Sequence, residues 1–307
     1  MIITVTLNAA LDLTYTVPSL TPHATHRVTE VAERPGGKGV NVARVLAALG
    51  HAVTVTGFAG GATGRTLRDH LTHTPGVTDA LCAVAGATRR TLAVVDARTG
   101  DTTQLNEPGP TVTPDEWAGF LDAYDALVRG EGVAAVALCG SLPPGVPVGA
   151  YALLVRAARA AGVPVLLDTS GEPLRRGVAA RPDVVKPNAE ELAELTGAHE
   201  PSRATRDARR RGAHAVVASL GAEGLLAVTP EGTWRAAPPG AVRGNPTGAG
   251  DSAVAGLLSG LVEGLSWPDR LARAVALSAA TVSAPTAGEY DPRVYADTLP
   301  KVTLTPA

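Results

Sequence analysis

Residues 151–168 read YALLVRAARAAGVPVLLD. The first part, 151–161, has the spacing of an amphipathic helix, and the apolar run 163–168 follows it as a short strand. The same alternation of helix and apolar strand recurs at 117–128 with 133–139, at 184–185 with 190–195, and at 203–211 with 215–219. Strands that are apolar on both faces and alternate with helices predict a parallel sheet covered by helices on both sides.

The first 110 residues have a different character. Two segments, 12–17 and 27–31, alternate polar and apolar residues as strands with one solvated face do, and a hairpin is expected around the turn 98–101. Apolar strands are expected at 2–7 and 53–58, and a helix at 41–49. We therefore expect one α/β domain over 1–307, with the amphipathic strands forming a small accessory sheet.

The last third predicts a hairpin, two helices and an irregular tail. The hairpin joins 225–228 to 233–236, the helices are 252–262 and 269–282, and the tail follows Pro300. No repeat, linker or low-complexity segment divides the chain.

Composition narrows the class of protein. The 307 residues are 45% hydrophobic and 18% charged, with a formal net charge of −2, which is typical of a globular protein without a general attraction for nucleic acid or anionic membranes. No run of about 18 apolar residues predicts a membrane span, and no signal peptide is evident, so we expect a cytoplasmic protein. Cys82 and Cys139 lie in apolar runs and are expected to be buried thiols.

The segment 245–251, NPTGAGD, is the first candidate for chemistry. A glycine-rich turn that enters a helix exposes backbone N–H groups where the helix dipole is positive, which suits phosphate oxygens. A carboxylate at that helix start, here Asp251, can accept a proton from a hydroxyl nucleophile. The same residues are equally consistent with an acidic side chain that only stabilises the helix.

Two further segments offer charge and exposed backbone. In 34–41, RPGGKGVN, the glycines allow close approach of a ligand, Lys38 adds a positive charge and Asn41 caps a helix. The spacing does not match a Walker A loop, and a plain turn is the simpler interpretation. In 219–224, SLGAEG, the glycines would allow a nucleotide to lie against the backbone, although a hairpin turn explains them as well.

The segment 186–191, KPNAEE, follows an apolar strand. Ligands of open α/β sheets bind at the carboxyl ends of strands, and Asn188 and Glu190 have the oxygen atoms to hold Mg²⁺ through water. An N-cap asparagine followed by a first-turn glutamate is the simpler interpretation. The basic segment 203–211 is interpreted as the solvated face of a helix.

Taken in order, these segments resemble the PfkB branch of the ribokinase-like sugar kinases along the whole chain. The likeness is greatest to its 1-phosphofructokinase and tagatose-6-phosphate kinase members. The segments that carry it are 4–8 with Asp12, 35–41, 88–89, 140–143, 186–190, 219–221 and 245–251.

The resemblance implies a ribokinase-like three-layer sandwich whose small β-sheet lid comes from about 10–34 and 88–108. It implies transfer of a phosphoryl group from ATP, with Mg²⁺, to a ketohexose phosphate such as fructose 1-phosphate or tagatose 6-phosphate. Asp251 would be the general base, and the amides of Gly248, Ala249 and Gly250 the anion hole.

The remaining roles are also implied by the resemblance alone. The sugar phosphate would be bound by Asp12, Arg27, Gly37, Lys38, Asn41, Arg89 and Ser141. The nucleotide would be bound by Lys186, Asn188, Glu190, Ser219, Gly221 and Gly224, with Mg²⁺ near Asn188 and Glu190. A homodimer formed through the lid is expected.

Departures from the family pattern lie on the sugar side. Ala9 stands where proline is usual, Ala87 where glutamate is common and Thr91 where asparagine is common. Two alternatives therefore stay open, a kinase of an unphosphorylated sugar or nucleoside and a sensor of sugars or nucleotides without turnover. An intact Asp251 disfavours the sensor, which needs no base.

Overall fold

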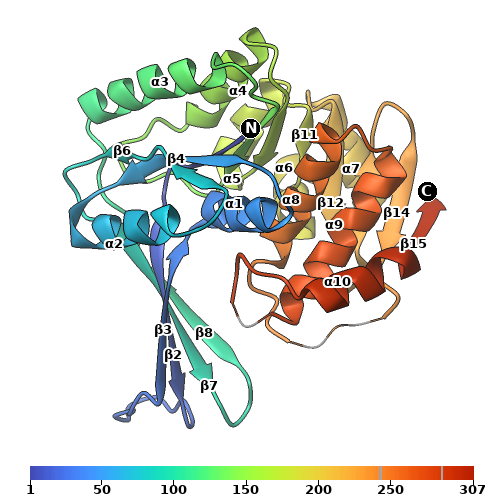
Figure 1. Ribbon diagram of the computed structural model, residues 1–307. Coiled ribbons are helices and arrows are strands. Elements are labelled where there is room, and N and C mark those ends of the chain that lie inside the picture. The colour runs from blue at the N-terminus through green and yellow to red at the C-terminus, as the bar shows by residue number, and fades with distance from the viewer. Residues whose placement is uncertain (241, 243, 285) are drawn as a thin grey trace.

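The computed structural model describes residues 1–240, 242, 244–284 and 286–307. Within these ranges, eleven strands form a central sheet in the order β15-β14-β13-β12-β11-β10-β9-β1-β4-β5, with β6 beside β4 (Figure 1). Their bounds are β1 Ile2–Thr6, β4 Val53–Ala59, β5 Val77–Asp79, β6 Cys82–Ala83, β9 Ala135–Cys139, β10 Val165–Asp168, β11 Val184–Val185, β12 Ala215–Ser219, β13 Leu225–Val228, β14 Thr233–Ala237 and β15 Thr303–Pro306. The strands from β12 through β5 run parallel, as the alternation with helices predicts, and β13 to β15 add antiparallel strands at one edge.

Helices cover both faces of this sheet. One face carries α3 Pro114–Val128, α4 Ala150–Ala160, α5 Gly171–Ala179, α6 Ala189–Thr196 and α7 Pro201–Arg210. The other carries α1 Lys38–Ala48, α2 Gly61–Thr72, α8 Ala249–Val262 and α9 Trp267–Val282, with α10 Pro292–Thr298 packed on α9. In β9, Val136 and Leu138 enter one core while Ala135 and Ala137 enter the other, so the strand is buried on both sides. The expected three-layer sandwich is confirmed.

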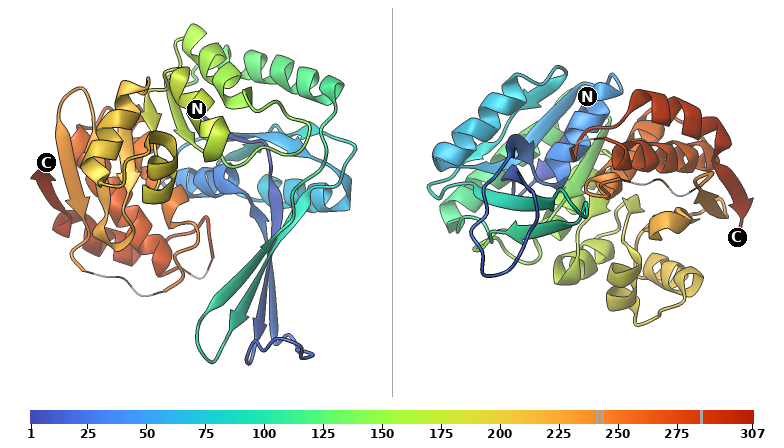
Figure 2. Two further views of the ribbon diagram at one scale, coloured as in Figure 1. Left: turned by 180° about the vertical axis from the view of Figure 1, so that it is seen from behind. Right: turned by 90° about the horizontal axis from the view of Figure 1, so that it is seen from below.

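A second sheet projects from this body and is called the lid below (Figures 1 and 2). Its order is β3-β2-β7-β8, with bounds β2 Ala10–Val17, β3 Glu30–Gly36, β7 Arg89–Asp96 and β8 Thr102–Asn106. The central pair β2 and β7 is parallel, and β7 with β8 forms the expected hairpin. The lid strands leave the body at the segments that carry the sugar-side candidates.

Two expectations were wrong. The tail after Pro300 is not irregular, because Thr303–Pro306 pairs with β14 as an edge strand. The strand expected at 27–31 begins only at Glu30 and runs on through Pro35 to Gly36, since its pairing with β2 extends that far. Proline fits there because β3 is an edge strand.

Three helices were not predicted, and one cysteine is less buried than expected. The sequence did not predict α2, α5 or α10, of which α2 starts within a glycine-rich stretch at Gly61. Cys139 is buried as expected, whereas Cys82 is half-buried, and both thiols are free. Among the described residues, no helix combines the length and the apolar character that a membrane crossing requires.

Candidate active site

Asp251 lies in the first turn of α8, at the carboxyl edge of the central sheet. The turn is possible because Gly248 takes φ 85° as the N-cap, where a side chain would also come within 2.8 Å of Ala287. The carboxylate is 7% exposed, and its Oδ2 accepts a hydrogen bond of 2.9 Å from Nδ2 of Asn41 on α1. The structure thus joins two of the predicted segments through one buried contact.

Burial raises the pKa of Asp251 to about 6, an effect that the Asp168 carboxylate increases. The Lys38 ammonium group, the Asn41 amide and Lys186 act in the opposite direction. A carboxylate with this pKa is largely ionised at neutral pH yet more basic than an ordinary aspartate, as a general base should be.

Asp168, at the end of β10, joins two lysines beneath the site. Its Oδ2 lies 3.3 Å from Nζ of Lys38 and its Oδ1 lies 3.3 Å from Nζ of Lys186. Burial would raise the pKa of Asp168, which is 1% exposed, but the two ammonium groups hold it below its ordinary value. The same pairing raises the pKa of Lys38 and keeps that lysine charged.

Sequence reasoning missed Asp168. A signal was available, because Asp168 ends an apolar strand beside those that precede Gly140 and Lys186, at the edge where ligands bind. Polar residues and a glycine follow Asp168 at 169–171, but they match none of the ligand-binding patterns used above, and the aspartate was assigned to the end of the strand 163–168. The partners of Asp168 are distant in sequence, with Lys38 130 positions away.

A cavity of about 710 Å³ opens next to this cluster. It is bounded by the start of α8, by α9 and by the turn between β12 and β13, and most of its walls are apolar. The predicted residues that line it are Asn188, Ser219, Gly221, Gly224, Ala249 and Gly250. Its volume is in the range of small-molecule and cofactor sites. The segments proposed for the nucleotide therefore meet in one cavity, although 219–224 is also the hairpin turn of its simpler interpretation.

Asn188 also fulfils its simpler interpretation as a helix cap. Its Oδ1 accepts the N–H of Glu191 at 2.8 Å, and the Glu191 carboxylate accepts the N–H of Asn188 at 2.8 Å. The charge of Glu191 helps to raise the pKa of Lys38, after the larger effect of Asp168. Glu190 is exposed. Of the two glutamates, Glu191 is therefore the one whose charge acts on the site, and the sequence analysis did not single it out.

The sugar-side candidates gather where the lid joins the body. Arg89 donates from Nε to the backbone oxygen of Asn8 at 3.1 Å, and Asn8 donates from Nδ2 to Oγ of Ser141 at 3.1 Å. Asp12 lies on the neighbouring strand, where burial raises its pKa while Thr91, Arg89 and Arg44 lower it.

Glycines make this corner possible. Gly37 has φ 101°, and a Cβ atom there would lie 2.8 Å from Cγ2 of Thr6. A Cβ atom on Gly36 would lie 2.1 Å from Cγ of Asp12. The glycine pair therefore lets Asp12 and the start of α1 lie side by side.

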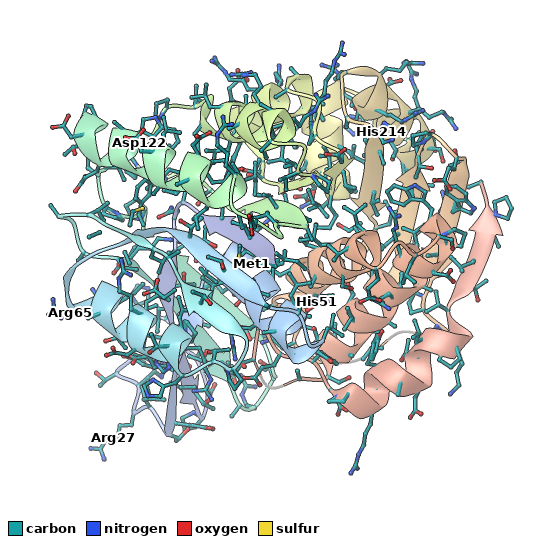
Figure 3. The ribbon with its side chains drawn as sticks, turned by 45° about the horizontal axis from the view of Figure 1, so that its top comes forward. Met1, Arg27, His51, Arg65, Asp122 and His214 are labelled. Atoms are coloured by element: carbon teal, nitrogen blue, oxygen red, sulfur yellow. The ribbon has the colours of Figure 1, made fainter. Side chains whose placement is uncertain are left out.

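Arg27 does not join this group within the chain. It lies in the loop between β2 and β3, at the free end of the lid, and its side chain is exposed (Figure 3). Asp12 and Arg89 lie at the opposite end of the same strands.

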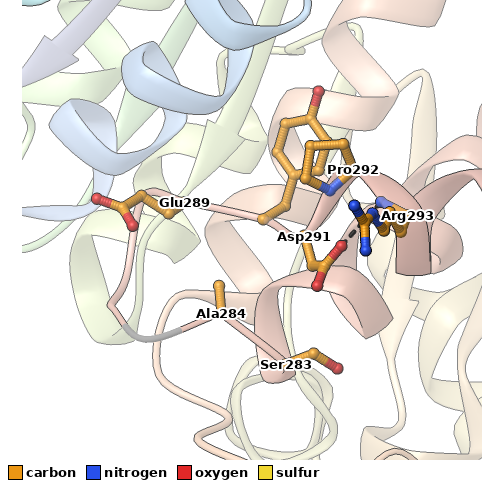
Figure 4. Close-up of a pocket in the computed structure, with 7 residues that line it drawn as sticks. Ser283, Ala284, Glu289, Asp291, Pro292 and Arg293 are labelled. Carbon is orange, nitrogen blue, oxygen red and sulfur yellow. Dashed lines mark hydrogen bonds between the residues drawn. The ribbon is translucent and has the colours of Figure 1, made fainter.

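A smaller cavity of about 400 Å³ beside α10 contains none of the predicted residues (Figure 4). Asp291 caps α10 there by accepting the N–H of Arg293 at 2.8 Å. The Glu289 carboxylate, which also lines this cavity, pairs with Arg44 at 2.7 Å, so both carboxylates already have partners within the chain.

A buried carboxylate at a helix start, a nucleotide-sized cavity beside it, the buried Lys186 and the partly exposed Lys38 are typical of a site for phosphoryl transfer to a hydroxyl group. Residues 4–293 match the pfkB family carbohydrate kinases. The chain is 42% identical to a 1-phosphofructokinase of Rhodobacter capsulatus, over 91% of this chain and 90% of that protein. The chain belongs to the pfkB family and is an ATP-dependent carbohydrate kinase.

Solved structures of sugar kinases have the same fold as this chain. The phosphofructokinase-2 of Escherichia coli in complex with fructose-6-phosphate superimposes with a TM-score of 0.89 at 31% identity, covering 98% of each chain. A ribokinase of Arabidopsis thaliana complexed with ribose and ATP has a TM-score of 0.74 at 22% identity, covering 97% of this chain and 98% of that chain. The second likeness supports the ribokinase-like fold alone.

Proposed function

We propose that this kinase transfers the γ-phosphoryl group of ATP to a ketohexose phosphate, with fructose 1-phosphate as the preferred substrate. The observation that carries the proposal is the position of Asp251, buried between the nucleotide-sized cavity and the corner that holds Asp12 and Arg89. The name of the Rhodobacter relative supports the choice of fructose 1-phosphate over tagatose 6-phosphate.

Asp251 acts as the general base in this proposal. It takes the proton of the attacking sugar hydroxyl, whose oxygen bonds to the γ-phosphorus as the bond to the bridging oxygen breaks and ADP leaves. The hydrogen bond from Asn41 fixes the orientation of the carboxylate. Because its pKa is about 6, the group is mostly ionised at neutral pH and can accept the proton.

Backbone amides and two lysines neutralise the developing phosphoryl charge. The N–H groups of Gly248, Ala249 and Gly250 lie at the positive end of α8. A Cβ atom on Gly250 would lie 3.7 Å from Nζ of Lys186, so this lysine reaches the helix start. Lys38 and Lys186 share Asp168, which holds both cations in place without neutralising them fully.

Magnesium fits the acidic end of α6. Mg²⁺ usually keeps several waters and binds through few carboxylates together with substrate phosphates, and it would neutralise phosphate charge here. Asn188 has its oxygen occupied by the helix cap, whereas one oxygen of Glu191 receives no hydrogen bond from the described residues. We place the metal near Asn188 through water, with Glu191 rather than Glu190 as its main carboxylate.

These two glutamates form a matched pair for a test. Glu191→Gln should raise the Mg²⁺ concentration for half-maximal rate several-fold, while Glu190→Gln should stay within about twofold. Equal effects of both variants would contradict the assignment. The amide oxygen of a glutamine at 191 can still accept the N–H of Asn188, and Glu190 is exposed, so both variants should keep the fold.

The phosphate already present on the sugar is assigned to Arg89 and Lys38. Arginine binds phosphate with two parallel hydrogen bonds, and lysine adds a point charge. Arg27 lies at the free end of its own lid and can join them only from a second copy of the chain. We therefore include a homodimer formed through the lid in the proposal. The exposed edge strand β8 supports it, because unpaired strand edges are available for pairing with another chain.

The decisive experiment couples ADP release to a panel of acceptors. The panel contains fructose 1-phosphate, tagatose 6-phosphate, fructose 6-phosphate, fructose, ribose and adenosine. We expect the highest kcat/KM with fructose 1-phosphate. A higher value with an unphosphorylated sugar or nucleoside would contradict the choice of a sugar phosphate and support the alternative substrate class.

A further inference from the structure

A second large cavity lies at the opposite end of the strands that carry the active site. It is bordered by the residues that precede β11 and β12, the C-terminal ends of α4 and α7, and the turn between β13 and β14. Its volume is about 890 Å³, and it shares no lining residue with the nucleotide-sized cavity. His214, one of its lining residues, lies at the edge of the molecule away from Arg27 and the lid (Figure 3).

The lining of this cavity is strongly basic. Five arginines face two carboxylates, which leaves an excess of three positive charges in a chain whose net charge is −2. The arginines are Arg159, Arg181, Arg206, Arg209 and Arg210, and the carboxylates are Asp183 and Glu231. A local concentration of charge of this kind attracts anions even though the whole protein does not.

The two carboxylates have other partners. Oδ2 of Asp183 accepts the N–H of Val165 at 2.8 Å. Burial lowers the pKa of Arg270 on α9, and the nearby Glu231 opposes that shift, so the charge of Glu231 acts on an arginine outside the lining. Neither carboxylate forms an ion pair of 4 Å or less with a lining arginine within the described ranges.

The arginines keep many donors for a ligand. Arg159 donates one N–H to the backbone oxygen of Ala180 at 3.2 Å, and Arg209 donates one to the backbone oxygen of His214 at 2.9 Å. Arg210 pairs with Asp207. Arg181 and Arg206 form no side-chain hydrogen bond or ion pair with any part of the chain that the structure describes. Since each guanidinium has five N–H donors, most remain available.

The backbone of Arg181 is unusual. It has φ 64°, a left-handed conformation that only His23 shares among the described non-glycine residues. The position follows the C-cap of α5, where glycine is the usual residue. Arginine is less favourable than glycine in this backbone conformation, and the side chain of Arg181 lines the basic cavity.

We propose that this cavity is a second anion site, which binds a small molecule carrying two or more phosphate groups. Phosphate oxygens match the paired donors of a guanidinium, and several arginines around one concave space favour more than one phosphate. The space is open to solvent, since Arg181, Arg206 and Arg210 are exposed, and its volume exceeds the 710 Å³ of the nucleotide-sized cavity, which is enough for a nucleotide or a sugar bisphosphate. This inference is independent of the sugar that the kinase phosphorylates.

The test is a calorimetric titration of the full chain with inorganic tripolyphosphate. Wild type should show two classes of site, because the active site also binds phosphates. The double variant Arg181→Gly with Arg206→Ser removes the two arginines that have no protein partner, and glycine suits the left-handed backbone at 181. This variant should lose one class of site, with affinity there falling at least tenfold.

The matched control removes two arginines elsewhere. Arg203 lies on α7 outside the cavity and Arg175 pairs with Glu172 on α5, so Arg175→Ser with Arg203→Ser changes the net charge equally. It should keep both classes of site, and both double variants should keep kinase turnover within twofold. One class of site in wild type, or equal weakening in both double variants, would overturn the proposal. Titrations with ADP and with a sugar bisphosphate then distinguish the two sources of phosphate.

Discussion

The body and the lid differ in how deeply their charged groups are buried and in how firmly partners hold them. In the body, Asp251 and Asp168 are 7% and 1% exposed, and each has a fixed partner from another element. In the lid, Asp12 and Arg89 are half-buried, and β8 is exposed along its whole length. Changes in the body should therefore act on the chemical step and on stability, whereas changes at the lid should act on sugar binding.

The largest expected effect tests the base. Asp251→Asn should lower kcat by about 10³-fold, because proton transfer by a positioned group typically contributes 10²–10⁴-fold. ATP affinity should stay within about threefold. Asp269→Asn is the matched control, since Asp269 holds the same position in the first turn of α9 but is exposed. If Asp251→Asn retained wild-type turnover in the ADP-release assay, the base assignment would fall.

The second effect concerns stability of the body. Asp168→Ala should lower the free energy of unfolding by about 3 kcal/mol, because it leaves the buried ammonium group of Lys186 without its carboxylate. Urea denaturation measures the change. Adding Lys186→Met should restore part of the loss, and an additive double variant would show that the two residues are not coupled.

The third effect separates stability from activity at one residue. The pKa of Asp251 is raised in the folded state, so that state binds the proton more tightly, and wild type loses stability as pH rises from about 4 to 6. Asp251→Asn removes this loss. At pH 8 the variant should be more stable by about 3 kcal/mol, and at pH 3.5 the difference should nearly vanish. Denaturation at the two pH values measures it, and a variant less stable than wild type at pH 8 would contradict the burial argument.

The smallest effect tests the lid. Arg89→Ala should raise KM for the sugar phosphate about tenfold with kcat within about threefold, as expected for loss of a charge-assisted phosphate contact. Arg90→Ala is the control on the same strand, because Arg90 is exposed and pairs with Glu107 at 3.1 Å. An unchanged KM in Arg89→Ala would favour an unphosphorylated substrate.

The sequence predicted what short segments encode. The alternation of helix and apolar strand predicted α4 with β10 and the parallel sheet. The glycine-rich turn predicted a helix from 252, and α8 begins three residues earlier, at Ala249. These signals are local, since they depend on side-chain period and on backbone freedom at glycine.

What the sequence did not predict depends on distant contacts. Asp168 gains its role from Lys38, 130 positions away, and the pairing of Asn8 with Ser141 spans 133 positions. The strand β15 exists because β14 offers an unpaired edge, a fact of topology that residues 303–306 alone do not show. Arg27 was predicted to bind the sugar phosphate because of its charge. The lid strands are long enough to separate it from Asp12, and their extent depends on pairing between β2, β3 and β7.

The shared carboxylate of Asp168 also restricts the order in which this site can change over evolutionary time. If one lysine is lost first, the aspartate keeps a partner in the other, and the intermediate protein survives. If the aspartate is lost first, two cations at the edge of the core repel each other without compensation. Descendants of this kinase that abandon the cluster should therefore have lost a lysine before the aspartate, and a reconstructed lineage would preserve that sequence of events.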